Sequence, residues 1–137
     1  MAGPGTAPDR TTYDGTVSVS VAFDELRARS AEFGDVAFLL TVTDDRRPHV
    51  VSVRVAWERD ELVAGAGRTT AANVAGQPTV SVLWSPPAHG DYSLIVDGTA
   101  EVQARDETSV VVIQPSRAVL HRVANADGDG PSCVTVL

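Results

Sequence analysis

The chain has 137 residues, of which 43% are hydrophobic and 21% charged, a composition typical of one globular domain and not of a disordered chain. No apolar run approaches the roughly 20 residues that a membrane-spanning helix needs, so we expect no membrane span. The net charge is -7 and every basic residue is an arginine, which disfavours nucleic-acid binding and excludes lysine Schiff-base chemistry.

Disulfide and metal sites have few candidate residues. Cys133 is the single cysteine, so no intramolecular disulfide can form. The three histidines (His49, His89 and His121) are far apart and show no metal-ligand spacing, so we expect no metal site. Residues 1–20 have no apolar core of a secretory leader and are predicted to form a flexible N-terminal tail. Residues 21–137 are predicted to form a single domain of a cytoplasmic protein.

A short amphipathic helix is predicted after the tail. Asp24 is a suitable N-cap, and Phe23 can pack back onto the first turn. Leu26, Ser30 and Phe33 then share one helix face, and Gly34 ends the helix.

Strand-like runs follow, rich in valine, leucine and threonine and interrupted every eight to twelve residues or so by turn-forming residues, a pattern typical of antiparallel meanders. The predicted strands are residues 36–43, 49–57, 61–66, 79–84, 92–104 and 109–121. Tight polar connections at 44–47 and 58–60 predict hairpins. In the second run, one face is wholly apolar, whereas the other carries Ser52 and Arg54 and is left to contact water, a partner or a ligand.

The segment 67–76 interrupts the strands and predicts a short helix. Thr69 or Thr70 is the expected N-cap, and Gly76 is the expected stop. A helix start offers unpaired N–H groups and a positive dipole, to which Arg68 adds a charge, so a phosphate site is one interpretation. A capped helix with a solvated arginine is the other. Arg54 could supply a second guanidinium if it points toward this segment.

Four other residues have two interpretations each. Trp84 is a core anchor or a stacking surface for a ring, and Asp97 before Gly98 indicates a bulge or a close backbone approach. His49 and His121 are interpreted as ordinary strand residues. Beyond the last strand, residues 125–131 are predicted to form a loop and 133–137 a short extended piece.

The order of these motifs resembles that of the pyridoxamine 5'-phosphate oxidase-like superfamily of flavin-binding split β-barrels. The resemblance spans roughly residues 33–122 and rests on residues 38–42 (FLLTV), 47–53 (RPHVVSV), 67–73 (GRTTAAN), 78–82 (PTVSV) and 96–102 (VDGTAEV). It implies a mainly β fold, a six-stranded antiparallel split barrel with a few short helices. It also implies a homodimer that binds FMN or the related deazaflavin coenzyme between its subunits.

The resemblance also implies which residues form the site. The second strand and the segment after the third hold the cofactor phosphate, which corresponds here to Ser52, Arg54, Gly67, Arg68, Thr69, Thr70 and Asn73. Trp84 and Tyr92 are expected to line the substrate side. The implied function is a flavin- or deazaflavin-dependent oxidoreductase acting on a small organic substrate, whose identity and catalytic residues the sequence does not give.

Two positions depart from the family pattern. The family often has a glycine where this chain has Arg46, which we expect a different turn type to accommodate. It commonly has a phosphate-binding lysine where this chain has Thr70. The second departure leaves an alternative open, a split barrel without a cofactor that binds a small ligand or acts as an interaction module.

Overall fold

The structure is a computed structural model that describes residues 10–13, 16–88 and 90–123. The predicted loop at 125–131, the extended piece at 133–137, Cys133 and His89 lie outside the described residues. No helix within the described ranges is long and apolar enough to cross a membrane.

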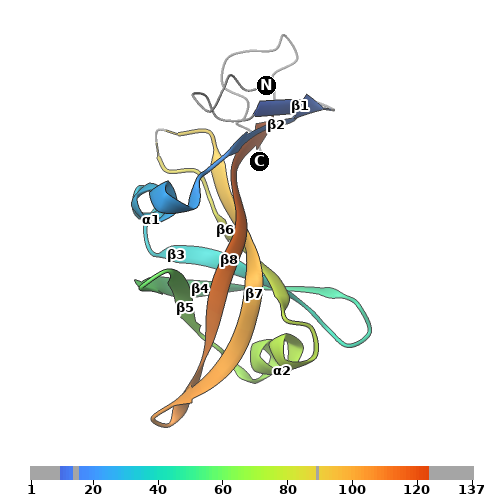
Figure 1. The fold of residues 1–137 in the computed structure, drawn as a ribbon. Helices are drawn as coiled ribbons and strands as arrows, with labels where there is room; N and C mark the ends of the chain where they lie inside the picture. The colour runs from blue at the N-terminus through green and yellow to red at the C-terminus, as the bar shows by residue number, and fades with distance from the viewer. Residues whose placement is uncertain (1–9, 14–15, 89, 124–137) are drawn as a thin grey trace.

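The described residues fold mainly into strands, as predicted, and include two helices between them (Figure 1). In chain order the elements are β1 Arg10–Tyr13, β2 Thr16–Ser20, α1 Phe23–Ala31, β3 Val36–Val42, β4 Pro48–Glu58, β5 Glu61–Gly65, α2 Arg68–Gly76, β6 Thr79–Trp84, β7 Ser93–Arg105 and β8 Thr108–Val123. The six predicted strands are present as β3 to β8, with ends that differ by one or two residues.

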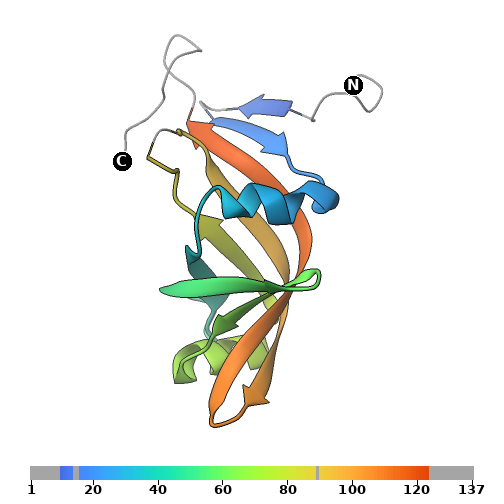
Figure 2. The ribbon, with the colours of Figure 1, turned by 90° about the vertical axis from the view of Figure 1, so that its left-hand side faces the viewer.

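Strands β3 to β8 close into a six-stranded antiparallel barrel in the order β8-β5-β4-β3-β6-β7, and β7 pairs again with β8. This closure confirms the predicted split barrel. Figures 1 and 2 show β7 and β8 as a long, strongly twisted pair that runs the full height of the barrel. β8 is long enough to pair with β5 near its start and with β2 near its end.

The N-terminal segment is more ordered than predicted. β1 pairs with β2, and β2 pairs with the last residues of β8, from Thr16 beside Val123 to Ser20 beside Val119. The prediction of a flexible tail up to residue 20 is therefore wrong for these two strands. The long β8 offers unpaired backbone groups beyond β5, and β2 satisfies them.

The core lies inside the barrel and follows the alternation of the strands. Along β3, Ala37, Leu39 and Thr41 are buried, whereas Val36 and Phe38, which alternate with them, are exposed. Other fully buried side chains come from the remaining strands and include Leu62, Val82, Leu94, Val96 and Ile113. One apolar face per strand is enough to fill a small barrel.

Helix α1 packs across the barrel wall through the residues expected to face the core. Leu26 and Ser30 are buried, and Phe33 packs against the core cluster. The predicted N-cap is wrong, because the helix begins at Phe23 with Ala22 as N-cap, and Asp24 lies in the first turn. Asp24 still favours the helix there through the dipole. Gly34 has φ +88°, a conformation that favours glycine at the turn into β3.

The hairpin turns at 44–47 and 58–60 form as predicted, and each contains one residue with positive φ, Arg46 at 68° and Arg59 at 60°. The expectation that another turn type accommodates Arg46 is wrong, because Arg46 adopts the left-handed conformation that glycine favours. In the same turn the Thr43 hydroxyl donates to Asp45, and this hydrogen bond lowers the pKa of the Asp45 carboxyl.

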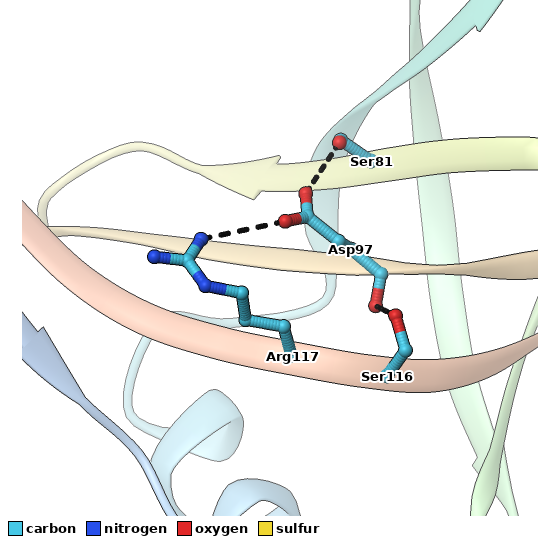
Figure 3. A network of polar contacts seen from close by, with 4 residues as sticks. All are labelled: Ser81, Asp97, Ser116 and Arg117. Atoms are coloured by element: carbon cyan, nitrogen blue, oxygen red, sulfur yellow. Dashed lines mark hydrogen bonds and ion pairs between the residues drawn. The ribbon is translucent and has the colours of Figure 1, made fainter.

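The predicted bulge at Asp97 is confirmed by a register shift between Asp97 and Gly98 in the pairing of β7 with β8. A Cβ at Gly98 would lie 2.5 Å from the Gln114 carbonyl oxygen, so only glycine fits this close backbone approach. Figure 3 shows how polar contacts hold the bulge. Ser81 Oγ donates to the Asp97 carboxylate (2.6 Å), and Ser116 Oγ donates to the Asp97 carbonyl oxygen (3.2 Å).

Candidate functional site

The start of α2 presents an uncapped helix N-terminus. The N-cap is Gly67, with no side-chain hydrogen bond to the helix, so the predicted capping by Thr69 or Thr70 is wrong. Ala71 N–H donates to the Gly67 carbonyl oxygen (2.9 Å), which leaves the N–H groups of the three preceding helix residues without a helical acceptor. An uncapped start of this kind favours an anion.

The predicted site residues on α2 divide into two groups. Arg68 and Thr69 are exposed beside the helix start, whereas Thr70 and Asn73 are buried at 3% and 6% exposure. Asn73 Nδ2 donates to Thr41 Oγ1 (3.0 Å) on β3, and Thr41 Oγ1 lies 3.5 Å from His49 Nδ1 on β4. Asn73 therefore attaches α2 to the barrel, Thr70 is buried on the same side of the helix, and the exposed pair is open to a ligand.

Gly67 keeps the space over the helix start open. Its φ of -74° and ψ of 177° are extended backbone that any residue adopts, so no turn requires a glycine here. A Cβ built on Gly67 or on Gly65 has no atom within 4 Å, so packing does not require one either. Because neither glycine carries a side chain, the space around the backbone N–H groups beside Arg68 stays open.

The predicted two-faced character of β4 is confirmed by its burial pattern. Ser52 and Arg54 are exposed on the outward face, and Val51, Val53 and Val55 face the core. Arg54 is not a free cation, because its Nη1 lies 2.9 Å from Asp35 Oδ2 in an exposed ion pair.

Strand register brings Arg54 near the start of α2. Val55 pairs with Ala64, so the next residues along the two strands, Arg54 and Gly65, are neighbours across β4 and β5. Arg68 follows Gly65 by three residues. With about 5 Å between strands and at most about 3.5 Å per residue, the Cα atoms of Arg54 and Arg68 lie within about 16 Å. Two extended arginine side chains can meet at one phosphate across that distance.

The two aromatic residues expected on the substrate side are not part of this arrangement. Trp84 is 1% exposed and donates from Nε1 to the Gly34 carbonyl oxygen (3.0 Å), so its alternative interpretation as a core anchor is the one supported. It lines a pocket of about 510 Å³ together with Asp35 and Trp57. Tyr92 precedes β7, carries the Arg122 guanidinium 5.5 Å from its ring centre, and lies next to Ser93, which pairs with His121 near the end of β8.

Two features of this region were missed in the sequence. Asp35 had no assigned role, although an acidic residue directly before a strand is a signal for a partner on the neighbouring strand. The outward faces of β3 and β4 also expose large apolar side chains, with Val36 at 53%, Phe38 at 37% and Val50 at 52% exposure. The alternation in the sequence places these residues outward but gives no reason for their apolar character.

Two known mycobacterial proteins are similar to the chain in sequence. They are the uncharacterized proteins Mb0449c of Mycobacterium bovis and MT0457 of Mycobacterium tuberculosis, each 36% identical over 66% of this chain and 73% of theirs. The chain belongs to their family. No family model matches it.

Solved structures identify the fold of this family member as the pyridoxamine 5'-phosphate oxidase-like split barrel. A candidate pyridoxamine 5'-phosphate oxidase of Listeria innocua aligns with a TM-score of 0.60 and 20% identity, covering 72% of this chain and 96% of that one. An F420 reductase aligns with a TM-score of 0.56 and 18% identity, covering 66% of this chain and 94% of that one. The heme storage protein HutZ of Vibrio cholerae aligns with a TM-score of 0.57 and 16% identity, covering 69% of this chain and 92% of that one. Proteins with this split-barrel fold are thus described as flavin-related in some cases and heme-related in others.

Proposed function

We propose that this split-barrel protein binds FMN or the deazaflavin coenzyme F420 through its phosphate and is an oxidoreductase acting on a small organic substrate. The observation that carries the proposal is the uncapped start of α2 with exposed Arg68 and Thr69. The F420 reductase and the candidate pyridoxamine 5'-phosphate oxidase, which share the fold, support this choice of cofactor.

The residues at the helix start fit a phosphate group. Arg68 supplies a full charge, Thr69 a hydroxyl, and the first turn its unpaired N–H groups, while Gly67 leaves room for the oxygens. Thr70, at the position of the family's lysine, is buried. In this proposal Arg68 takes over the charge that the lysine supplies elsewhere.

The chain's own residues bind and orient. A bound flavin or deazaflavin supplies hydride or electron transfer through its ring. Arg68 and Thr69 hold the phosphate end, and Ser52 and Arg54 contact the group from the outward face of β4. No described side chain near the start of α2 is assigned as an acid or base.

We propose that a second copy of the chain packs against the apolar outward face of β3 and β4. Val36, Phe38 and Val50 stand out from neighbouring strands, and exposed apolar patches of this kind mark interfaces. A charge at Val50 tests the assignment, since Val50→Glu is expected to convert a dimer to a monomer in light scattering. A monomeric wild type at micromolar concentration would contradict it.

The cofactor is tested by titrating the purified protein with FMN, F420 and riboflavin while following their fluorescence. FMN or F420 is expected to saturate the site at micromolar concentration, and Arg68→Ala is expected to weaken binding by about tenfold or more, the effect of a lost charged hydrogen bond. Riboflavin has no phosphate and is expected to be insensitive to the substitution. Arg29→Ala, an exposed arginine on α1, is the matched control. Equal weakening by both variants would contradict the proposal.

One observation favours the alternative of a split barrel without a flavin. Thr70 is buried and the chain has no lysine, so the site lacks the family's cation at this position. Heme is included as a further probe, because the fold is shared with a heme storage protein. Absence of FMN and F420 binding by a folded protein would support a cofactor-free ligand-binding or interaction module, and binding of heme alone would indicate a heme protein.

A further inference from the structure

A pocket of about 440 Å³ is lined by the first turns of α1, the turn that joins β4 to β5, and β8. None of the residues that line it belongs to α2 or to the predicted flavin site. Its volume falls within the range of small-molecule sites. We propose that this pocket binds a small aromatic zwitterion, of which a free aromatic amino acid is the simplest example.

Two aromatic side chains supply apolar surface to the pocket. Phe23, the first residue of α1, is 57% exposed, so packing against the barrel does not account for its ring. Trp57, near the end of β4, is partly buried and packs against the core cluster. Rings of this kind attract an aromatic ligand through the burial of apolar area and through ring-to-ring contact.

Hydrogen bonds hold the indole of Trp57 in place before a ligand binds. Its Nε1 donates to Ser30 Oγ (2.8 Å), and Ser30 Oγ donates to the Arg27 carbonyl oxygen (2.9 Å). Ser30 itself is buried at 3% exposure. Because the polar atom of the indole already has a partner and the ring is fixed, a ligand that contacts it pays little further ordering entropy.

The guanidinium of Arg27 is positioned at the pocket by the neighbouring turn. Its Nη1 donates to the Arg59 carbonyl oxygen (3.0 Å), and Arg59 lines the pocket as well. Within the described part of the chain, neither arginine forms an ion pair. A guanidinium has five N–H donors, so Arg27 keeps donors that a ligand carboxylate can use.

Two acidic side chains, Asp24 on α1 and Asp60 in the turn, line the same pocket. Neither has an ion-pair partner among the described residues. Two basic and two acidic groups therefore surround one small volume. A ligand with a single charge meets like charges there as well as opposite ones, whereas a zwitterion offers an opposite charge to both kinds of group.

The test compares ligands that share a phenyl ring and differ in charge, each titrated into the purified full chain by isothermal titration calorimetry. L-Phenylalanine carries both charges, 3-phenylpropionate lacks the ammonium group, and 2-phenylethylamine lacks the carboxylate. L-Phenylalanine is expected to bind saturably, and the other two about fivefold more weakly or worse, the effect of one lost charge contact at an accessible site. L-Alanine, which lacks the ring, is expected not to bind.

Substitutions in the pocket test where each part of the ligand lies. Phe23→Ala is expected to weaken all three phenyl ligands by about threefold to tenfold. Arg27→Gln should weaken L-phenylalanine and 3-phenylpropionate and spare 2-phenylethylamine. The double variant Asp24→Asn, Asp60→Asn should weaken L-phenylalanine and 2-phenylethylamine and spare 3-phenylpropionate. Arg29→Gln, which changes an arginine of α1 outside the pocket, is the matched control.

The altered pocket side chains are all exposed, so each variant is expected to fold, which circular dichroism checks. Opposite selectivity of the arginine and aspartate variants supports the proposal. The proposal is wrong if the folded wild type shows no saturable binding of L-phenylalanine, or if a ligand with one charge binds as tightly. It is also wrong if Phe23→Ala and Arg27→Gln both leave the affinity for L-phenylalanine unchanged, because the ligand then lies elsewhere. None of these outcomes depends on whether the protein binds a flavin.

Discussion

α1 and α2 are both nine residues long, and each packs on the barrel next to a hairpin turn, but different chemistry holds them. Two indoles anchor the α1 region: Trp57 Nε1 donates to Ser30 Oγ (2.8 Å), and Trp84 Nε1 donates to the Gly34 carbonyl oxygen (3.0 Å). α2 is attached by an amide and a hydroxyl, through Asn73 and Thr41.

The difference separates structural residues from residues open to a ligand. At α1 the aromatic side chains are used for packing, which leaves Trp84 without a ring face for a substrate. At α2 the inward Asn73 holds the helix and Thr70 is buried, whereas the outward Arg68 and Thr69 have no polar side-chain partner among the described residues. A residue's place on the helix therefore decides its role more than its type does.

Removing an indole from the α1 side is expected to have the largest effect. Trp84→Ala should lower the free energy of unfolding by about 4 kcal/mol, because it deletes a fully buried side chain and leaves a cavity. Trp84→Phe should cost less, about 2 kcal/mol, since a six-membered ring still fills most of the space, whereas the pyrrole ring and its hydrogen bond to Gly34 are lost. Urea denaturation measures both values. A cost below about 1 kcal/mol for the alanine variant would mean that Trp84 is not an anchor.

Removing the amide from the α2 side should have an intermediate effect. Asn73→Ala is expected to lower the free energy of unfolding by about 2 kcal/mol, because a buried hydrogen bond is lost and Thr41 loses its donor. Thr69→Ala, on the exposed side, should stay within about 0.5 kcal/mol. A double-mutant cycle with Thr41→Val should give a coupling of about 1 kcal/mol. Additive effects would show that the contact does not hold the helix.

Glycine substitutions in the two hairpin turns should change the free energy of unfolding least, and by similar amounts next to α1 and next to α2. Arg46→Gly, in the turn whose Asp44 approaches Gly76 of α2, should raise the free energy of unfolding by about 0.5–1 kcal/mol by relieving a positive φ. Arg59→Gly, beside α1, should raise the free energy of unfolding by a similar amount. The variant keeps the backbone carbonyl oxygen of residue 59, which accepts a hydrogen bond from Arg27. Thermal unfolding measures both, with Arg47→Gly as the destabilised control. Loss of stability in both glycine variants would contradict the strain argument.

Several elements follow from local sequence signals. The strands, the two hairpins and the bulge at Asp97 were predicted from alternation and turn residues that act on their immediate neighbours. The predicted helix starts were wrong because Ala22 and Gly67 are N-caps with no capping side chain. The prediction placed the N-caps at the polar residues that follow them. The strands β1 and β2 were missed although Asp14-Gly15 between two threonine-rich runs is a hairpin signal.

The sequence by itself determined the inward and outward faces of the strands and the turns, because these depend on spacing along the chain. The tertiary structure decided which polar groups meet. The ion pair of Asp35 with Arg54, the hydrogen bond of Asn73 to Thr41 and that of Trp84 to Gly34 join residues that are 19, 32 and 50 positions apart in the chain. Such contacts are fixed only when the barrel closes and sets the register, since a shift of one residue would turn Arg54 and its neighbours to the opposite face.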